Sequence, residues 1–99
     1  MNVLFKTTKI ETLYVIPLNK LGKQKYSREL IKSYKNKIEI LTGIDKLEEL
    51  RNFPGLNFEP LKGDRKGEFS IKLNDQFRLI FIPERGGILL VTEISKHYE

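Results

Sequence analysis

Two runs of alternating apolar and polar residues near the C-terminal end constrain the fold of this chain most strongly. Residues 69–73 read Phe-Ser-Ile-Lys-Leu, and residues 77–82 read Phe-Arg-Leu-Ile-Phe-Ile. A period of two is typical of a strand that buries one of its faces. The polar turn Asn74-Asp75-Gln76 separates the runs, so the sequence predicts a β-hairpin.

The register of this hairpin follows from its apolar residues, because antiparallel partners share a face of the sheet. The matching pairs are Leu73 with Phe77, Ile71 with Leu79 and Phe69 with Phe81. The same register sets Lys72 opposite Arg78 on the other face. Like charges opposed across strands repel each other, so we expect an anion between these two side chains, or exposure of both to water.

The remainder of the chain predicts helices and two further strands. A short strand at Val3-Leu4-Phe5 precedes a segment, 7–16, that favours a short helix although its β-branched residues also fit a strand. Ser27 is a good N-cap for a helix that ends at Thr42-Gly43, with an apolar stripe at three- and four-residue spacing. A second helix is expected from Asp45, with Glu48 as its capping-box partner, to a point before Asn52. After the turn 83–87, the apolar run 88–91 fits a central strand covered on both faces.

Strand, helices and a β-meander in this order predict an α+β fold. We expect a small twisted antiparallel sheet, made of the N-terminal strand and a C-terminal three-stranded meander, with a helical hairpin packed on one face. Ninety-nine residues suit a single domain, 1–99. No apolar run is long enough to span a membrane, no export signal is visible and cysteine is absent, so the cytoplasm is the expected compartment.

The charge of the chain indicates polyanionic partners. Its formal net charge is +5, and basic residues gather between positions 20 and 37: Lys20, Lys23, Lys25, Arg28, Lys32, Lys35 and Lys37. This region fits either an ordinary solvated surface or a patch that faces RNA phosphates, as on a ribosome. One histidine and no cysteine disfavour a metal site, and no P-loop or dinucleotide-binding fingerprint is present.

Several polar residues could act together if they meet on the polar face of the sheet. These are the carboxylate Glu59, the cations Lys62, Lys72 and Arg78, and the terminal pair His97-Tyr98. They would supply a base, stabilising cations and an acid for RNA cleavage without a metal or cofactor. Each residue taken singly also fits an ordinary structural role: Glu59 as a surface acid, Arg78 as a partner of Glu93 or Asp75.

The stretch Glu59-Pro60-Leu61-Lys62-Gly63-Asp64, followed by Gly67 and by Phe69 to Phe81, resembles the RelE/ParE toxin superfamily. Within it the stretch is most similar to the HigB group of plasmid maintenance killer toxins, with YoeB as a near relative. The resemblance covers residues 58–98. It implies a ribosome-dependent mRNA endonuclease, which is the toxin of a type II toxin–antitoxin pair and is held inactive by a HigA-like antitoxin.

The resemblance also implies roles for single residues. Glu59 matches the general base and Arg78 the arginine that stabilises the transition state, while Lys62, Arg65, Lys66 and Lys72 fall at basic positions around the RNA. His97-Tyr98 matches the terminal pair of YoeB, in which His is the acid and Tyr helps to orient the substrate base. HigB chains usually end Asp-Tyr-His, whereas this one reads Lys96-His97-Tyr98, so the two residues could exchange roles.

Two other functions stay open on the sequence. A ParE-like toxin shares the implied fold but poisons DNA gyrase without nuclease chemistry. A decayed toxin would bind an antitoxin and no longer arrest growth.

Overall fold

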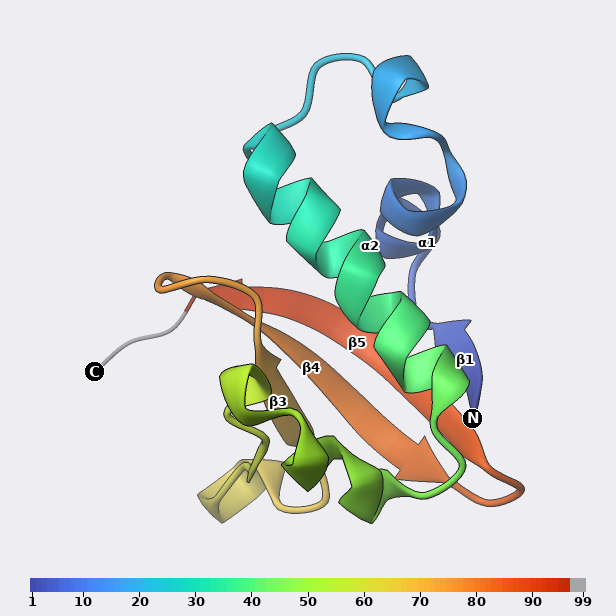
Figure 1. Cartoon of the computed structure of the whole chain (residues 1–99), viewed down its shortest axis with the longest axis vertical. Coiled ribbons are helices and arrows are strands. Elements are labelled where there is room, and N and C mark those ends of the chain that lie inside the picture. Colours follow the sequence, from blue (N-terminus) through green and yellow to red (C-terminus); the bar gives the residue numbers. More distant parts are fainter. Residues whose placement is uncertain (97–99) are drawn as a thin grey trace.

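A five-stranded sheet is covered on one face by two α-helices in the computed structural model, which describes residues 1–96 (Figure 1). The α-helices are α1 (Thr8–Val15) and α2 (Arg28–Gly43). The strands are β1 (Asn2–Phe5), β2 (Glu59–Pro60), β3 (Phe69–Lys72), β4 (Phe77–Glu84) and β5 (Ile88–Lys96). Four short 3₁₀ segments, at Leu18–Lys20, Leu47–Asn52, Pro54–Leu56 and Gly63–Arg65, complete the described elements.

The α+β class is confirmed, but the sheet is mixed and has one strand more than expected. Its order is β1-β5-β4-β3-β2. β1 runs parallel to β5, whereas an all-antiparallel sheet was predicted. The additional strand, β2, has two residues and pairs with β3 at the opposite edge. No alternating pattern marks a strand so short, which explains why it was missed.

The predicted register of the β3–β4 hairpin is confirmed. Phe69 pairs with Phe81, Ile71 with Leu79 and Lys72 with Arg78. The turn is held by Asn74, whose Oδ1 accepts hydrogen bonds from the backbone N–H groups of Gln76 and Phe77, each at 2.8 Å. An asparagine side chain that bonds the backbone two or three residues on is a frequent turn device.

The helices begin at side-chain caps. Ser27 is the N-cap of α2, as predicted, and its Oγ accepts the N–H of Leu30 at 3.1 Å. Thr7 caps α1 in the same way, so the segment 7–16 is a helix and not a strand. α2 lies diagonally over the sheet with α1 beside it (Figure 1). Its buried stripe is Leu30, Ile31, Tyr34, Ile38 and Leu41, and burying each such apolar side chain contributes roughly 1.5–3 kcal/mol.

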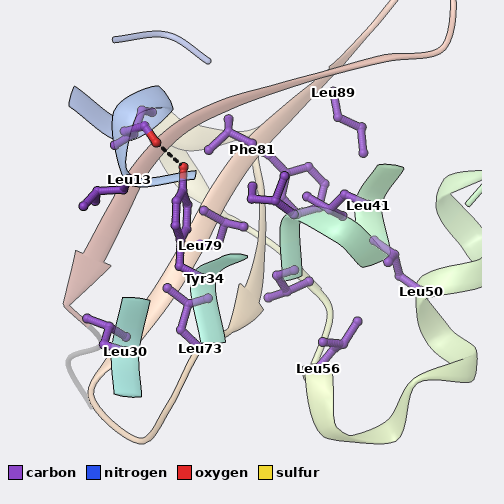
Figure 2. Close-up of a cluster of buried hydrophobic side chains, with 14 of the residues drawn as sticks. Leu13, Leu30, Tyr34, Leu41, Leu50, Leu56, Leu73, Leu79, Phe81 and Leu89 are labelled. Atoms are coloured by element: carbon purple, nitrogen blue, oxygen red, sulfur yellow. Dashed lines mark hydrogen bonds between the residues drawn. The ribbon is translucent and has the colours of Figure 1, made fainter. Parts of the chain in front are cut away.

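The predicted second helix of the hairpin is only a 3₁₀ segment, Leu47–Asn52. The N-cap of this segment is Lys46, and the acidic partner in its capping box is Glu49 rather than Glu48. Oε2 of Glu49 accepts the backbone N–H groups of Asp45 at 2.8 Å and Lys46 at 2.7 Å. The helix that packs beside α2 is therefore α1, joined to it by the hydroxyl of Tyr34, which donates to the Ile10 carbonyl at 2.6 Å (Figure 2).

The core lies between the helices and the sheet, where Leu41 and Leu50 approach Phe81 and Leu89 (Figure 2). β5 lies inside the sheet, between β1 and β4. Leu89 and Val91 are fully buried, but Ile88 and Leu90 are only half-buried. The expectation that this strand is covered on both faces is therefore wrong, because both α-helices lie on the same side.

Candidate active site

The face of the sheet away from the helices brings together three of the predicted site residues, Glu59, Lys72 and Arg78. Ile71 and Leu79 are fully buried in the core, so their neighbours along β3 and β4 point the other way. The pairing sets out two rows on this outer face. One row is Glu59, Ser70, Ile80 and Glu93, and the other is Lys72, Arg78 and Ser95.

Arg78 is held firmly on this face, with only 8% of its surface exposed. Its Nε donates to Oγ of Ser70 at 2.8 Å, and one terminal nitrogen donates to the backbone carbonyl of Asn57. Asn57 has a positive φ of 45°, which turns the chain just before β2; asparagine tolerates this conformation better than most residues. A guanidinium has five N–H donors, and within residues 1–96 these two bonds use two of them.

Glu59 lies on β2, next to the serine that Arg78 binds. It pairs with Ser70 across the β2–β3 ladder, and its side chain is exposed. The ladder continues past β2, since the N–H of Leu61 donates to the Glu68 carbonyl at 2.8 Å. Ser70 therefore lies between the carboxylate and the guanidinium, and all three come from adjacent strands. A carboxylate and a positioned cation share the face of the sheet away from the helices.

Lys72 and Arg78 are opposed, as predicted, but their charged groups bind different protein partners. Nζ of Lys72 lies 3.2 Å from Oδ1 of Asp75 in the turn. Arg78 instead points across β3 toward Ser70 and Asn57. The two positive charges are thus separated within the described structure. Neither of the carboxylate partners considered for Arg78 is used: Asp75 binds Lys72, and Glu93 binds Arg65.

The basic loop between β2 and β3 carries two exposed lysines, Lys62 and Lys66. Arg65 differs from them, because it forms ion pairs. Its Nε and one terminal nitrogen bind the carboxylate of Glu68 at 3.2 Å and 2.8 Å, and the same terminal nitrogen binds Glu93 on β5. The hydrogen bonds to Glu68 and Glu93 raise the pKa of Arg65, and Arg65 in turn lowers the pKa of Glu68. No local pattern in the sequence predicts this pairing, since 28 positions separate Arg65 from Glu93.

Four residues of this face were not predicted as site residues: Ser70, Asn57, Glu68 and Glu93. Only Ser70 left a signal in the sequence, because a small polar residue stands in the outward phase of a strand that is otherwise rich in large side chains. The predicted residues His97 and Tyr98 lie outside the described part of the chain.

The basic region 20–37 faces solvent only in part. Nζ of Lys35 donates to the carbonyls of Tyr14 at 2.8 Å and Ile16 at 2.6 Å, at the end of α1. Lys37 is half-buried and donates to Oγ of Ser33 at 3.3 Å. Burial lowers the pKa of both lysines. The hypothesis of a continuous phosphate-facing patch is therefore wrong for these two side chains: Lys35 binds the end of α1, and Lys37 binds Ser33 of its own helix.

No group of three or more carboxylate, imidazole or thiol side chains is placed to hold a metal ion within residues 1–96. Over the same residues, no helix is both long and apolar enough to cross a membrane.

Comparison with known proteins agrees with the fold described above. Toxin HigB-1 of Vibrio cholerae is 43% identical over 61 residues, which make up 62% of this chain and 63% of that protein's length. A YoeB/ParE toxin from Agrobacterium tumefaciens has a similar fold, with a TM-score of 0.61 and 21% identity over 99% of this chain and 100% of that one. A YoeB–YefM complex from Staphylococcus aureus also scores 0.61, at 20% identity over 99% and 98%.

The family profile described as "RelE-like toxin of type II toxin-antitoxin system HigB" matches residues 6–92. This match spans both α-helices, strands β2 to β4, the loop that bears Arg65 and the first part of β5, and it agrees with the resemblance seen in the sequence. The chain therefore belongs to the HigB-like toxin family.

Proposed function

We propose that this chain is the toxin of a type II toxin–antitoxin system and that it cuts mRNA on the ribosome. The observation that carries the proposal is the position of Glu59 and Arg78 on the two sides of Ser70, on the face of the sheet away from the helices. A carboxylate can take a proton, and a fixed guanidinium can stabilise charge on a phosphate. These are the two roles that cleavage of an RNA phosphodiester demands first.

The proposed reaction starts at the 2′-hydroxyl of the RNA. Glu59 accepts its proton, the 2′-oxygen attacks phosphorus, and N–H groups of Arg78 stabilise the charge on the phosphorane-like transition state. The bond from phosphorus to the 5′-oxygen breaks, and an acid protonates that oxygen. His97 and Tyr98 stay the proposed candidates for the acid. The products are a 2′,3′-cyclic phosphate and a 5′-hydroxyl.

The exposed cations around this face would hold the RNA backbone. Lys62, Lys66 and Lys72 would bind phosphates as point charges. Arg65 is a different case, since a phosphate would have to displace Glu68 or Glu93 from its guanidinium. Single-stranded mRNA is the expected substrate, because its unpaired bases are free to stack and to bond.

A HigA-like antitoxin is the proposed partner. We expect it to lay an acidic segment over the outer face, where it would meet Arg78 and the exposed lysines. The solved structure from Staphylococcus aureus is named as a YoeB–YefM complex, so a protein with this fold forms such an assembly.

The proposed activity is tested by mapping 5′-hydroxyl ends of mRNA on ribosomes after brief expression. Wild-type chain should create new ends, and Glu59→Gln should reduce their yield roughly 10²–10⁴-fold, the usual contribution of a general base. Glu84→Gln is the matched control, because it neutralises an exposed glutamate at the end of β4. If Glu59→Gln produced ends as readily as wild type, the mechanism would be wrong.

The same samples address the ParE-like alternative. A gyrase poison would leave the mRNA intact and would accumulate gyrase–DNA cleavage complexes. A decayed toxin would give neither product.

A further inference from the structure

A second feature of the outer face is a cavity of about 420 Å³, within the size range of ligand sites. It lies beyond the Glu59–Ser70 pair, between the end of β1 and the loop that follows β2. Its lining includes Lys6, Arg65, Glu68, Ile82, Thr92 and Glu93. Ile82 supplies an apolar wall, and the other five are polar or charged.

The guanidinium of Arg65 is immobilised at this cavity. It binds both oxygens of Glu68 and one oxygen of Glu93, so two carboxylates define its orientation. Its side chain is nevertheless 43% exposed. A fixed and accessible guanidinium plane is a surface on which an unpaired nucleobase stacks.

The edges of the cavity are rich in hydrogen-bond acceptors. An ionised carboxylate has about four lone-pair sites, and the bonds to Arg65 occupy only some of those on Glu68 and Glu93. The side chain of Glu93 is 44% exposed and can be reached from solvent. Arg65 lowers the pKa of Glu68, with a smaller contribution from the charge of Lys6, so this group remains an acceptor at neutral pH.

The cavity is placed to receive RNA that also reaches the candidate active site. Glu93 stands in the same row as Glu59, with Ile80 and Ser70 between them. Three strand spacings separate the two glutamates, which amounts to about 14 Å. A strand of RNA that passes Arg78 can therefore place a neighbouring base over Arg65.

We propose that this cavity is a base-binding subsite that selects an unpaired nucleobase with an exocyclic amino group and rejects uracil. The base stacks on Arg65, its amino group donates to Glu93 or Glu68, and Lys6 meets a phosphate. Uracil fits poorly because it presents the carbonyl oxygen O4 where cytosine presents its amine, and this oxygen cannot donate to a carboxylate. The one donor on that edge of uracil, N3–H, lies one ring position away. The subsite rests on the proposed function, since it assigns RNA as the ligand of the same face.

The test compares cytidine and uridine 5′-monophosphates, whose bases differ at position 4, an amine against a carbonyl, and at N3, an acceptor against an N–H donor. The full-length wild-type protein, labelled with ¹⁵N, is titrated with each nucleotide. We expect cytidine monophosphate to shift the amide signals of Lys6, Ile82 and Glu93, and to bind on the order of tenfold more tightly than uridine monophosphate. Equal affinities, or shifts confined to other parts of the molecule, would overturn the subsite.

Glu93→Gln should remove the preference, because an amide can donate to the uracil carbonyl as well as accept from the cytosine amine. Glu84→Gln, outside the cavity, should preserve it. A preference that persists in Glu93→Gln would refute the role of this carboxylate. If Glu93→Gln does not fold, the affinities of the wild-type protein for the two nucleotides still test whether the subsite exists. Loss of the subsite would leave ribosomal mRNA cleavage intact, whereas failure of the proposed function would appear as missing 5′-hydroxyl ends.

Discussion

The bond between Arg78 and Ser70 is the contact on which the candidate site depends at the scale of single residues. Both side chains are buried on the outer face, at 8% and 1% exposure. A buried arginine without a partner would be costly, and here Ser70 and the Asn57 carbonyl supply acceptors. The same two bonds aim the guanidinium at the position beside Glu59.

Ser70→Ala tests this positioning. The substitution leaves the Nε–H of Arg78 without its acceptor, and we expect the free energy of unfolding to fall by about 1–3 kcal/mol. The guanidinium also loses its fixed direction, so the yield of 5′-hydroxyl mRNA ends should fall while the charge of the site is unchanged. Urea unfolding and end mapping measure the two effects.

Ser95→Ala provides the control, because Ser95 lies opposite Arg78 on β5 in the same row. It should alter both quantities much less than Ser70→Ala. Full activity and stability in Ser70→Ala would mean that this bond does not position Arg78.

At the scale of elements, the contact between α1 and α2 is polar as well as apolar. Tyr34 is fully buried on α2, and its hydroxyl donates to the Ile10 carbonyl of α1 at 2.6 Å. The next residue of α2, Lys35, binds the carbonyls of Tyr14 and Ile16 at the end of α1. The two bonds from Lys35 satisfy carbonyls at the C-terminal end of α1, where intrahelical donors run out.

Tyr34→Phe should lower the free energy of unfolding at neutral pH by about 0.5–1.5 kcal/mol, because the buried hydrogen bond from the Tyr34 hydroxyl to the Ile10 carbonyl is lost. Burial raises the pKa of Tyr34 above its ordinary value of 10.0. The folded state thus holds the phenol proton after the unfolded chain has released it. The contribution of Tyr34 is therefore complete below about pH 10 and declines as the pH rises further.

The stability advantage of wild type over Tyr34→Phe is expected to narrow above pH 10. Thermal unfolding of both proteins between pH 7 and pH 11.5 measures this. Tyr26→Phe is the comparison at neutral pH, since Tyr26 is only half-buried, and a change within about 0.5 kcal/mol is expected there. A constant gap between wild type and Tyr34→Phe across the whole range would contradict the burial argument.

At the scale of the whole molecule, the placement of charge matters more than the net value of +5. The basic loop offers Lys62 and Lys66 to solvent, whereas Arg65 between them is paired with two glutamates. Lys35 and Lys37 likewise direct their charges toward the protein. A count of basic residues therefore overstates the number available to RNA.

The salt dependence of RNA binding tests this distribution. For a single-stranded RNA with 2′-O-methyl groups, which block the attack, log affinity should fall linearly with log salt, by about 0.7 per phosphate contact. The double variant Lys62→Gln/Lys66→Gln removes two phosphate contacts, so the slope of log affinity against log salt should become shallower by about 1.4. Fluorescence anisotropy at several salt concentrations measures the slope.

Lys9→Gln/Lys46→Gln removes two charges from exposed positions on α1 and before Leu47–Asn52, and so controls for net charge. Its slope should stay near that of wild type. An equal decrease of the slope in both double variants would show that RNA binding depends only on the net charge of the protein.

Features that depend on neighbouring residues were determined by the sequence alone. The period of two in residues 69–73 and 77–82 required one register, because a slip of one residue would turn apolar side chains to water. Ser27 is predictable as the start of α2, because its hydroxyl accepts an N–H only three residues ahead. The outward position of Lys72 and Arg78 followed from the same periodicity.

Contacts between distant segments were decided only by the tertiary structure. β1 lies parallel to β5, β2 extends the sheet beside Ser70, and Arg65 reaches Glu93. No local pattern encodes these arrangements. A two-residue strand has no period, and an ion pair across 28 residues depends on where the sheet brings its strands. The site joins both kinds of information: periodicity assigned Arg78 to the outer face, and the packing of the chain supplied the partners that hold it there.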